Sequence, residues 1–405
     1  MLDALWLFAV VLIEGWALWT GNGMVTLAGT LCLLVSASLL LTRRVALAGV
    51  RCTHVLEQCR ANFGDVIAFT IELVNLKPLP LTWLRVEDGV PRGLRIEGGR
   101  IESGRSEFFP HVLMVVAMLP YERLVRRLHV HCTRRGEHKF GPVSLQSGDY
   151  LGLLDAYGSN REEHYLLVFP KVFTLELGKL ATQLLLGQDA ARRYYLPDPM
   201  RVIGARHYHS GDPYRSIDWR ATAKTNQLMV RVLEPSSTPV LDIVLDFTGP
   251  LRDPPNFAPD ELECAISVVA SLSRFASERR MAVGVRGNGH SRRALLNVPP
   301  SAKPGQFAVI MEALAHATTM PYVRLNEMLS RPAPHVPAGA TTIIVTAALR
   351  DPVLATAIEL QRRRRPFLIV YIAPEQARPP ADRLPICKVT YDKTWTEWQA
   401  LALVA

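Results

Sequence analysis

Two long apolar stretches open the chain, at residues 4–19 and 24–41, and the short polar turn TGNG (20–23) separates them. Each stretch has about the length that a helix needs to cross a hydrocarbon core of roughly 30 Å. A secretory signal peptide is the rival interpretation, but no Lys or Arg precedes the first stretch and a second apolar run follows at once. The pattern therefore predicts a transmembrane helical hairpin over residues 1–44.

Residues 45–170 show a different pattern, in which short β-rich runs are separated by Gly, Pro and Asn. The clearest are VIAFTIELVN (66–75) and LTWLRVED (81–88). Alternation of apolar and polar positions is typical of strands that bury one face, and no helical periodicity lies between the runs. We therefore expect an antiparallel β-sandwich-like domain here.

From residue 240 onward, strand-like apolar runs alternate with helical patterns. VLDIVLDF (240–247) has the composition of a buried strand, residues 260–280 place apolar side chains on one helical face, and TTIIVTAAL (341–349) is another buried run. This order predicts a doubly wound α/β domain over residues 240–405. Residues 171–239 have a mixed character and are expected to pack on that domain.

The distribution of charge predicts the topology. The first 42 residues carry only Asp3 and Glu14 as charged groups, and the turn between the apolar stretches has no basic residue, whereas Arg43, Arg44 and Arg51 follow the second stretch. The positive-inside rule therefore places the N-terminus and everything after the second stretch in the cytoplasm. A charged carboxyl inside a span is costly, so Glu14 should face the partner helix, water or the interface, or else be protonated, and its role stays open.

Composition narrows the class of protein. With 49% hydrophobic and 20% charged residues, the chain is too apolar to be disordered and too polar to consist mostly of spanning helices. Its formal net charge is +9, but no run rich in Lys and Arg is interleaved with aromatic residues. Nucleic acid is therefore not expected as a partner.

The most unusual local run lies at residues 206–235, where five distinctive residues fall within nine positions. These are Gly211, Asp212, Arg215, Asp218 and Trp219. Gly211-Asp212-Pro213 reads as a turn in which Asp212 caps backbone amides, and Arg215 is close enough in sequence to pair with a carboxylate through two hydrogen bonds. The run predicts a structural clamp or a partner-binding surface.

An enzymatic interpretation of the same neighbourhood is the alternative. His207 and His209 precede Asp212 and Asp218, so the four side chains offer acid/base chemistry for a hydrolase. The spacing specifies no nucleophile or oxyanion donor, and the chain lacks a G-x-S-x-G elbow, an H-E-x-x-H helix and a Walker A loop. We therefore expect no catalytic residues and no small-molecule substrate.

Several motifs together carry a family resemblance. The apolar hairpin, the run RRGEHKFGPVSLQSGDYLGLLDA (134–156), the run GDPYRSIDW (211–219) and a following strand that ends at Asp246 resemble the bacterial domain-of-unknown-function 58 family. The resemblance implies a von Willebrand factor A-like fold over residues 240–405. It also implies a bacterial inner-membrane protein that works with a MoxR-type AAA+ ATPase, with no established reaction.

The implied fold commonly binds Mg²⁺ where its first strand ends in D-x-S-x-S, because a carboxylate and two hydroxyls are hard oxygen ligands. Here the matching run offers Asp246 and Thr248, but Pro250 has no hydroxyl, and Ala347 stands where the fold often has a second acidic residue. Asp253 could reach in from the loop. We expect a degenerate site, with Asp246 and Thr248 as weak candidates, and no cofactor.

These observations favour a non-enzymatic scaffold or adaptor. The expected partners are the MoxR-type AAA+ ATPase and other membrane or cytoplasmic proteins, with the lipid bilayer contacted through the N-terminal hairpin. The family resemblance supplies the ATPase, whereas the apolar hairpin and the two folded domains come from the pattern along the chain.

Overall fold

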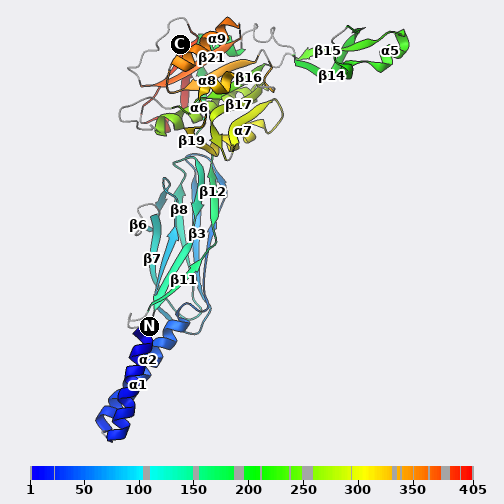
Figure 1. Ribbon diagram of the computed structural model, residues 1–405. Coiled ribbons are helices and arrows are strands. Elements are labelled where there is room, and N and C mark those ends of the chain that lie inside the picture. The colour runs from blue at the N-terminus through cyan, green and yellow to red at the C-terminus, as the bar shows by residue number, and fades with distance from the viewer. Residues whose placement is uncertain are drawn as a thin grey trace. The chain divides into compact units, whose positions relative to one another are not determined.

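The protein, seen here as a computed structural model, forms two compact units, Met1–Val168 and Phe169–Ala405 (Figure 1). The structure describes residues 2–403 apart from 22, 104–109, 149–154, 187–195, 210–211, 237–238, 249–258, 293, 331–334, 338–339, 350, 364, 375–383 and 393.

The first unit begins with two helices, α1 (Leu2–Thr20) and α2 (Gly23–Ala46), which lie side by side (Figure 1). By length and composition, α2 could cross a membrane. Glu14 of α1 is only 7% exposed, and a Cβ atom at Gly29 of α2 would lie 1.8 Å from its Oε2 atom. The carboxyl of Glu14 therefore packs into the space that Gly29 leaves open.

Three sheets follow in the first unit. The four-stranded sheet has the order β1 (Val50–Leu56), β3 (Val66–Asn75), β8 (Arg123–His131), β5 (Arg95–Glu97). The five-stranded sheet has the order β11 (Asp155–Asn160), β10 (Val143–Gly148), β4 (Leu81–Gly89), β7 (Pro110–Met118), β6 (Arg100–Ser103). The small sheet has the order β2 (Arg60–Ala61), β12 (His164–Val168), β9 (Gly136–Phe140). Strands pair antiparallel in the two larger sheets.

The pattern of buried positions explains why these strands form a sandwich-like body. Burial alternates along β3, and its inward side chains Phe69 and Ile71 share one core with Leu84 of β4 and Leu128 of β8. Each strand therefore buries one face. The prediction of an antiparallel β-rich domain is confirmed.

The second unit is built on a mixed sheet with the order β18 (Ala294–Ser301), β17 (Ala282–Ser291), β16 (Val240–Leu245), β20 (Thr341–Thr346), β21 (Phe367–Ala373), β22 (Ile386–Thr390). The strands from β17 to β22 are parallel, whereas β18 and the short β19 (Ala317–Pro321) pair antiparallel with β17. The alternating strand and helix pattern predicts this layout, because parallel neighbours need crossover helices.

Helices cover both faces of this sheet. One core cluster joins Leu241, Ile243 and Leu245 of β16 with side chains of α3 (Lys179–Leu186), α6 (Pro259–Glu278) and α7 (Gln306–Ala315). A second cluster joins Val244 with α8 (Leu325–Ser330) and α9 (Asp351–Arg362). The short strands β13 (Thr174–Leu177) and β23 (Ala400–Leu403) pair beside the first cluster, where η2 (Trp395–Glu397) contributes Trp395.

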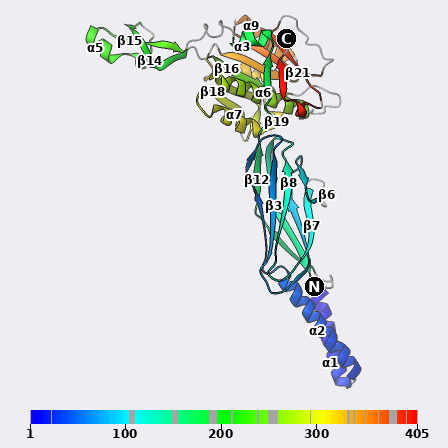
Figure 2. The same ribbon diagram turned by 180° about the vertical axis from the view of Figure 1, so that it is seen from behind.

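Residues 171–239 fold as two different parts. Phe173, Ala181 and Leu185 do pack into the first core cluster. Farther along, β14 (Leu196–His207) and β15 (Met229–Ser236) form a separate two-stranded antiparallel sheet, with η1 (Tyr214–Ser216) and α5 (Trp219–Thr225) between them (Figure 2). We call residues 196–236 the arm.

Candidate functional site

Asp212 holds the turn of the arm, and the cation that pairs with it is Arg206 rather than the expected Arg215. The Nη1 and Nη2 atoms of Arg206 donate to the carboxylate of Asp212 at 2.7 Å each, and the backbone N–H of His209 donates to it at 2.9 Å. The hydrogen bonds from Arg206, followed by that from His209, lower the pKa of Asp212 to about 2. Within the described residues Arg215 has no carboxylate partner, so the clamp prediction named the wrong arginine.

Asp218 is the N-cap of α5 and does not form an ion pair with Arg215. Its Oδ1 atom accepts from the backbone N–H groups of Arg220 at 3.0 Å and Ala221 at 3.1 Å. A carboxylate in this position satisfies amides that have no partner within the helix. The backbone N–H of Asp218 donates to Met229, which ties the short helix to β15.

The arm has a small core of its own. Ile217 and Val230 are 3% and 4% exposed and face each other through an isolated β-bridge. Asp212 and Asp218 lie on either side of Ile217 in sequence. Gly211 lies outside the described residues. Asp212 and Asp218 therefore fold the arm locally.

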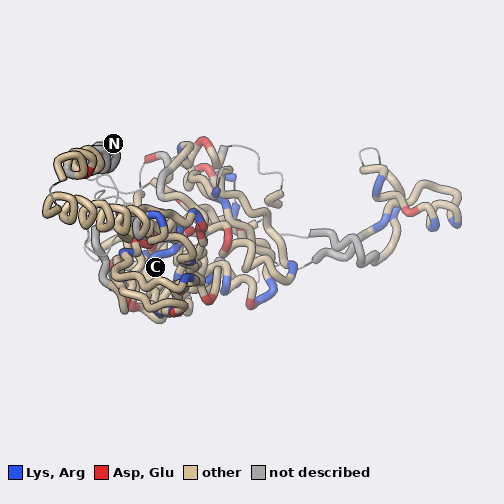
Figure 3. The backbone as a smooth tube through the Cα atoms, turned by 90° about the horizontal axis from the view of Figure 1, so that it is seen from below, with Lys and Arg blue, Asp and Glu red and all other residues tan. Residues whose placement is uncertain are grey.

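What the arm presents outward is aromatic and basic. Tyr214 is 79% exposed and Trp219 is 66% exposed, and the ring of Tyr208 stacks on that of Tyr214. Among the arm side chains that the structure describes, the exposed cations are Arg206, Arg215, Arg220, Lys224 and Arg231. Figure 3 shows where Lys and Arg positions fall along the backbone of the arm. Exposed aromatic rings beside arginines are the composition of protein-binding hot spots.

The two carboxylates that the hydrolase alternative would use already have hydrogen-bond partners within the arm. Asp212 and Asp218 are each engaged by arm residues, and His209 meets Asp212 through its backbone N–H group. His207 and His209 are exposed side chains. The structure thus shows no described contact that pairs an imidazole with a carboxylate of the motif for acid/base work.

A second candidate site lies at the carboxyl end of β16, beside β20, where the strand order changes direction. Asp246 is 1% exposed, and its Oδ1 atom accepts from the backbone N–H of Thr248 at 2.9 Å and from the amide of Asn288 at 3.1 Å. Its Oδ2 atom lies 2.9 Å from the hydroxyl of Thr346. Burial raises the pKa of Asp246 despite these hydrogen bonds.

Asn288 is the residue of this site that the sequence-based interpretation missed. The backbone N–H of Phe247 donates to its Oδ1 atom at 2.7 Å, which fixes the amide so that its Nδ2 atom faces Asp246 and Thr248. Gly287 and Gly289 flank it, and a Cβ atom at either would lie 2.7 Å from the Phe247 ring. A polar residue between two glycines in a buried strand was the available signal.

The donor set does not fit a divalent cation. The Nδ2 atom of Asn288 lies 3.1 Å from Asp246 Oδ1 and 3.3 Å from Thr248 Oγ1, so an N–H donor bridges the oxygens that a cation would need as ligands. Pro250 and Asp253 lie outside the described residues. Asp242 is already paired with Arg286 of β17.

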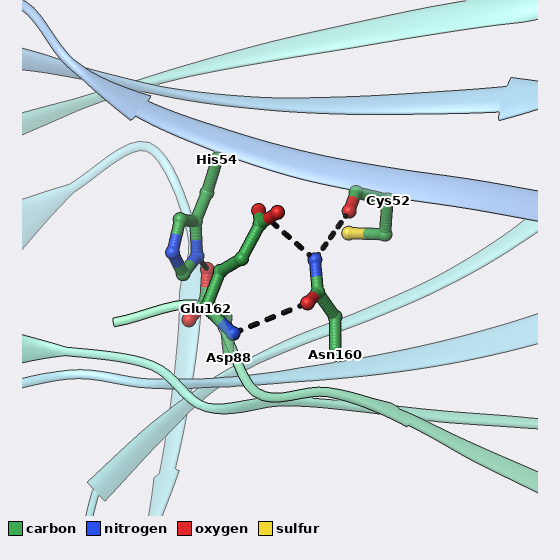
Figure 4. A network of polar contacts seen from close by, with 5 residues as sticks. All are labelled: Cys52, His54, Asp88, Asn160 and Glu162. Carbon is green, nitrogen blue, oxygen red and sulfur yellow. Dashed lines mark hydrogen bonds and ion pairs between the residues drawn. The ribbon is translucent and has the colours of Figure 1, made fainter. Parts of the chain in front are cut away.

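A third polar group is buried in the β-sandwich-like domain (Figure 4). His54 Nδ1 lies 3.1 Å from Asp88 Oδ2, and Asn160 donates both to the carbonyl of Cys52 and to the side chain of Glu162. His54 and Asp88 are 2% and 0% exposed. Burial, and then the charges of Asp88 and Glu162, raise the pKa of the Cys52 thiol to about 12. The thiol of Cys52 is therefore protonated at neutral pH.

Comparison with known proteins does not indicate an activity for this chain. An uncharacterized protein of Bacillus subtilis (strain 168), YeaD, is 24% identical over 248 residues, which cover 61% of this chain and 58% of the relative. The CARDB domain of a Pyrococcus furiosus protein aligns with 29% of this chain and 91% of its own, at 11% identity and a TM-score of 0.20. Escherichia coli alpha-2-macroglobulin aligns with 42% of this chain and 9% of its own, at 14% identity and a TM-score of 0.24.

Likenesses at such TM-scores carry no argument about fold or function, and the match to YeaD spans little more than half of that protein. A family model also matches the chain, over a region that begins within the arm and ends just before β21. Residues 204–366 match the model described as "Protein of unknown function DUF58". This part of the chain is therefore a DUF58 region, which confirms the family resemblance that its motifs indicate.

Proposed function

We propose that the chain is a non-enzymatic, membrane-tethered scaffold that binds protein partners through the arm. The observation that carries this proposal is the pair of exposed rings, Tyr214 and Trp219, on an arm in which Asp212 and Asp218 form internal contacts. Trp and Tyr are enriched among the residues that contribute most of the binding energy at protein interfaces. Asp212 holds the turn before Tyr214 and Asp218 caps the helix that begins at Trp219, which supports a binding role for the two rings.

The tether of this proposal is the α1–α2 hairpin in the bacterial inner membrane, with both units in the cytoplasm. Its support is the apolar length of α2, together with Arg44 in the last turn of that helix and Arg51 after it. Glu14, packed against Gly29, faces the partner helix, where an intramembrane carboxyl is least costly.

The α/β domain supplies the body of the scaffold. Its strand order and the site at Asp246 support a von Willebrand factor A-like fold that works without Mg²⁺, because the amide of Asn288 takes the place of a cation between Asp246 and Thr248. No cofactor is part of this proposal. The partner that the family resemblance implies is a MoxR-type AAA+ ATPase.

Site-specific photo-crosslinking in living cells tests the function. A benzoylphenylalanine residue at position 219 of the full chain should cross-link to the ATPase, whereas the same residue at Tyr322, which is 68% exposed on the α/β domain, should not. Trp219→Ala should weaken the purified complex by at least tenfold, as expected for a hot-spot aromatic residue. Equal cross-linking at both positions, or full affinity of Trp219→Ala, would refute the role of the arm.

A further inference from the structure

One end of the β-sandwich-like domain exposes a group of large apolar side chains. Leu76 and Leu79 in the β3–β4 loop are 52% and 47% exposed, and Leu119 and Tyr121 in the β7–β8 turn are each 68% exposed. The Nδ2 atom of Asn75 donates to the carbonyls of Leu79 and Leu119 at 3.0 and 2.9 Å, which joins the loop to the turn. We call these four side chains the apolar collar.

The collar is fixed to the end of α2. Lys77, in the same loop, is 8% exposed, and its ammonium donates to the carbonyls of Val45 at 2.6 Å and of Ala46. The backbone N–H of Leu76 donates to Gly49 at 2.8 Å, just after the helix. A cation at this position satisfies the carbonyls that a helix C-terminus leaves free. The loop that carries Leu76 and Leu79 is therefore tied to the end of α2.

The length of α2 places that end in the membrane interface. At 1.5 Å per residue, its 24 residues span about 36 Å, against about 30 Å for the hydrocarbon core and 40–45 Å for the whole bilayer. A helix that begins at one boundary of the core therefore ends in the opposite headgroup layer. The carbonyls that Lys77 caps lie in that layer, and so does the loop that carries Lys77.

We propose that the apolar collar inserts into the headgroup region of the membrane that α2 crosses, which makes this end of the domain a lipid-binding surface. The inference rests on the proposed membrane tether. Leucines at this depth bury apolar area, and tyrosine is favoured at the membrane–water boundary. Arg44 and Arg51 are exposed beside the helix end and suit anionic headgroups. Arg123, at the start of β8, already pairs with Glu72, so we do not count it among the cations that face the headgroups.

Fluorescence quenching in liposomes tests the proposal with a control inside the same chain. Cys59 is exposed at the opposite end of β1, and the other described cysteines outside the helices are buried. The full chain, with Cys32→Ala, is labelled with an NBD fluorophore either at Cys59 or, in Cys59→Ser backgrounds, at Leu119→Cys or Leu79→Cys. Phosphatidylglycerol-containing liposomes carry nitroxide lipids as one quencher, and iodide in the buffer is the other.

Labels at positions 119 and 79 should be quenched several-fold more by the nitroxide lipids than the label at Cys59, and several-fold less by iodide. If the labelled chain does not float with the liposomes, the tether fails and the collar with it. If the chain floats but position 119 behaves like Cys59, the tether stands and the collar proposal is wrong. Protection of position 119 from both quenchers would show that protein covers the collar, which also overturns the proposal.

Discussion

Asn288 determines the chemistry at the end of β16, because its fixed amide contacts both Asp246 and Thr248. We expect the melting temperature of the full chain in detergent to be the same in millimolar Mg²⁺ as in EDTA. Asn288→Asp removes the donor and adds a second carboxylate, so it should lower the free energy of unfolding by about 1–3 kcal/mol in EDTA. Mg²⁺ should then restore part of that loss.

The matched control is Asn297→Asp on the exposed side of β18, which should change neither stability nor Mg²⁺ response. At 100 times its dissociation constant a metal that binds only the folded chain adds about 2.7 kcal/mol, so thermal melts detect it readily. A rise of several degrees for the parent chain in Mg²⁺, lost on Asp246→Ala, would contradict the interpretation of the site.

Asp246 should also make stability depend on pH. The hydroxyl of Thr346 lies 2.9 Å from Asp246 Oδ2 and 3.0 Å from the carbonyl of Ala348, and its single proton serves only one of them. A proton on Asp246 lets both contacts form. Because burial raises the pKa of Asp246 above its ordinary value of 3.8, the folded chain binds more protons than the unfolded chain across that interval.

The free energy of unfolding that Asp246 contributes should therefore fall as pH rises from about 4 through the raised pKa, and stay constant above it. Denaturant titrations of the parent and Asp246→Asn from pH 4 to pH 8 measure this difference, because Asp88, which is also buried, is present in both chains. A difference that grows in favour of the parent as pH rises would show that the carboxylate form is the stable one.

At the scale of elements, we expect Asp218 to support the fold of the arm and Trp219 to support partner binding. Asp218→Ala removes the N-cap of α5 and should speed amide exchange at Arg220 and Ala221 by about fivefold, equivalent to about 1 kcal/mol. Trp219→Ala should leave that exchange unchanged while it abolishes partner binding. Lys224→Ala, exposed on the same helix, is the control for exchange. An equal effect of Trp219→Ala on exchange would mean that the indole supports the fold.

The α1–α2 pair depends on the absence of a side chain at residue 29. Gly29→Leu should force Glu14 out of its packed position, because even a Cβ atom there would meet Oε2 at 1.8 Å. We expect a lower melting temperature of the full chain in detergent micelles. Gly15→Leu is the matched control, since nothing lies within 4 Å of a Cβ atom at that glycine. Equal melting of the two variants would show that the helices do not need this contact.

For the whole molecule, the testable property is topology. Fusions after Val168, the last residue of the first unit, should give bright green fluorescent protein and inactive alkaline phosphatase, because Arg44 and Arg51 follow the apolar stretch that forms most of α2. Active phosphatase and dark fluorescent protein at that position would place both units outside the cytoplasm and remove the MoxR-type ATPase as a partner.

Local patterns were readable in the sequence, and contacts distant along the chain were not. The alternation in residues 66–75 predicts β3 to the residue, and the apolar run from residue 240 predicts β16. The clamp arginine was misassigned because sequence distance favours Arg215, whereas the hairpin brings Arg206 to Asp212. Asn288 meets Asp246 across 42 positions, and only the flanking glycines marked it.

The capping of α2 by Lys77 has a mechanical consequence. Since the ammonium group holds the last carbonyls of the helix, no flexible linker separates α2 from the domain that follows. Thicker or thinner bilayers change the tilt of a spanning helix. The β-sandwich-like domain would tilt together with the helix. Bilayer thickness would therefore set the direction in which the domain points.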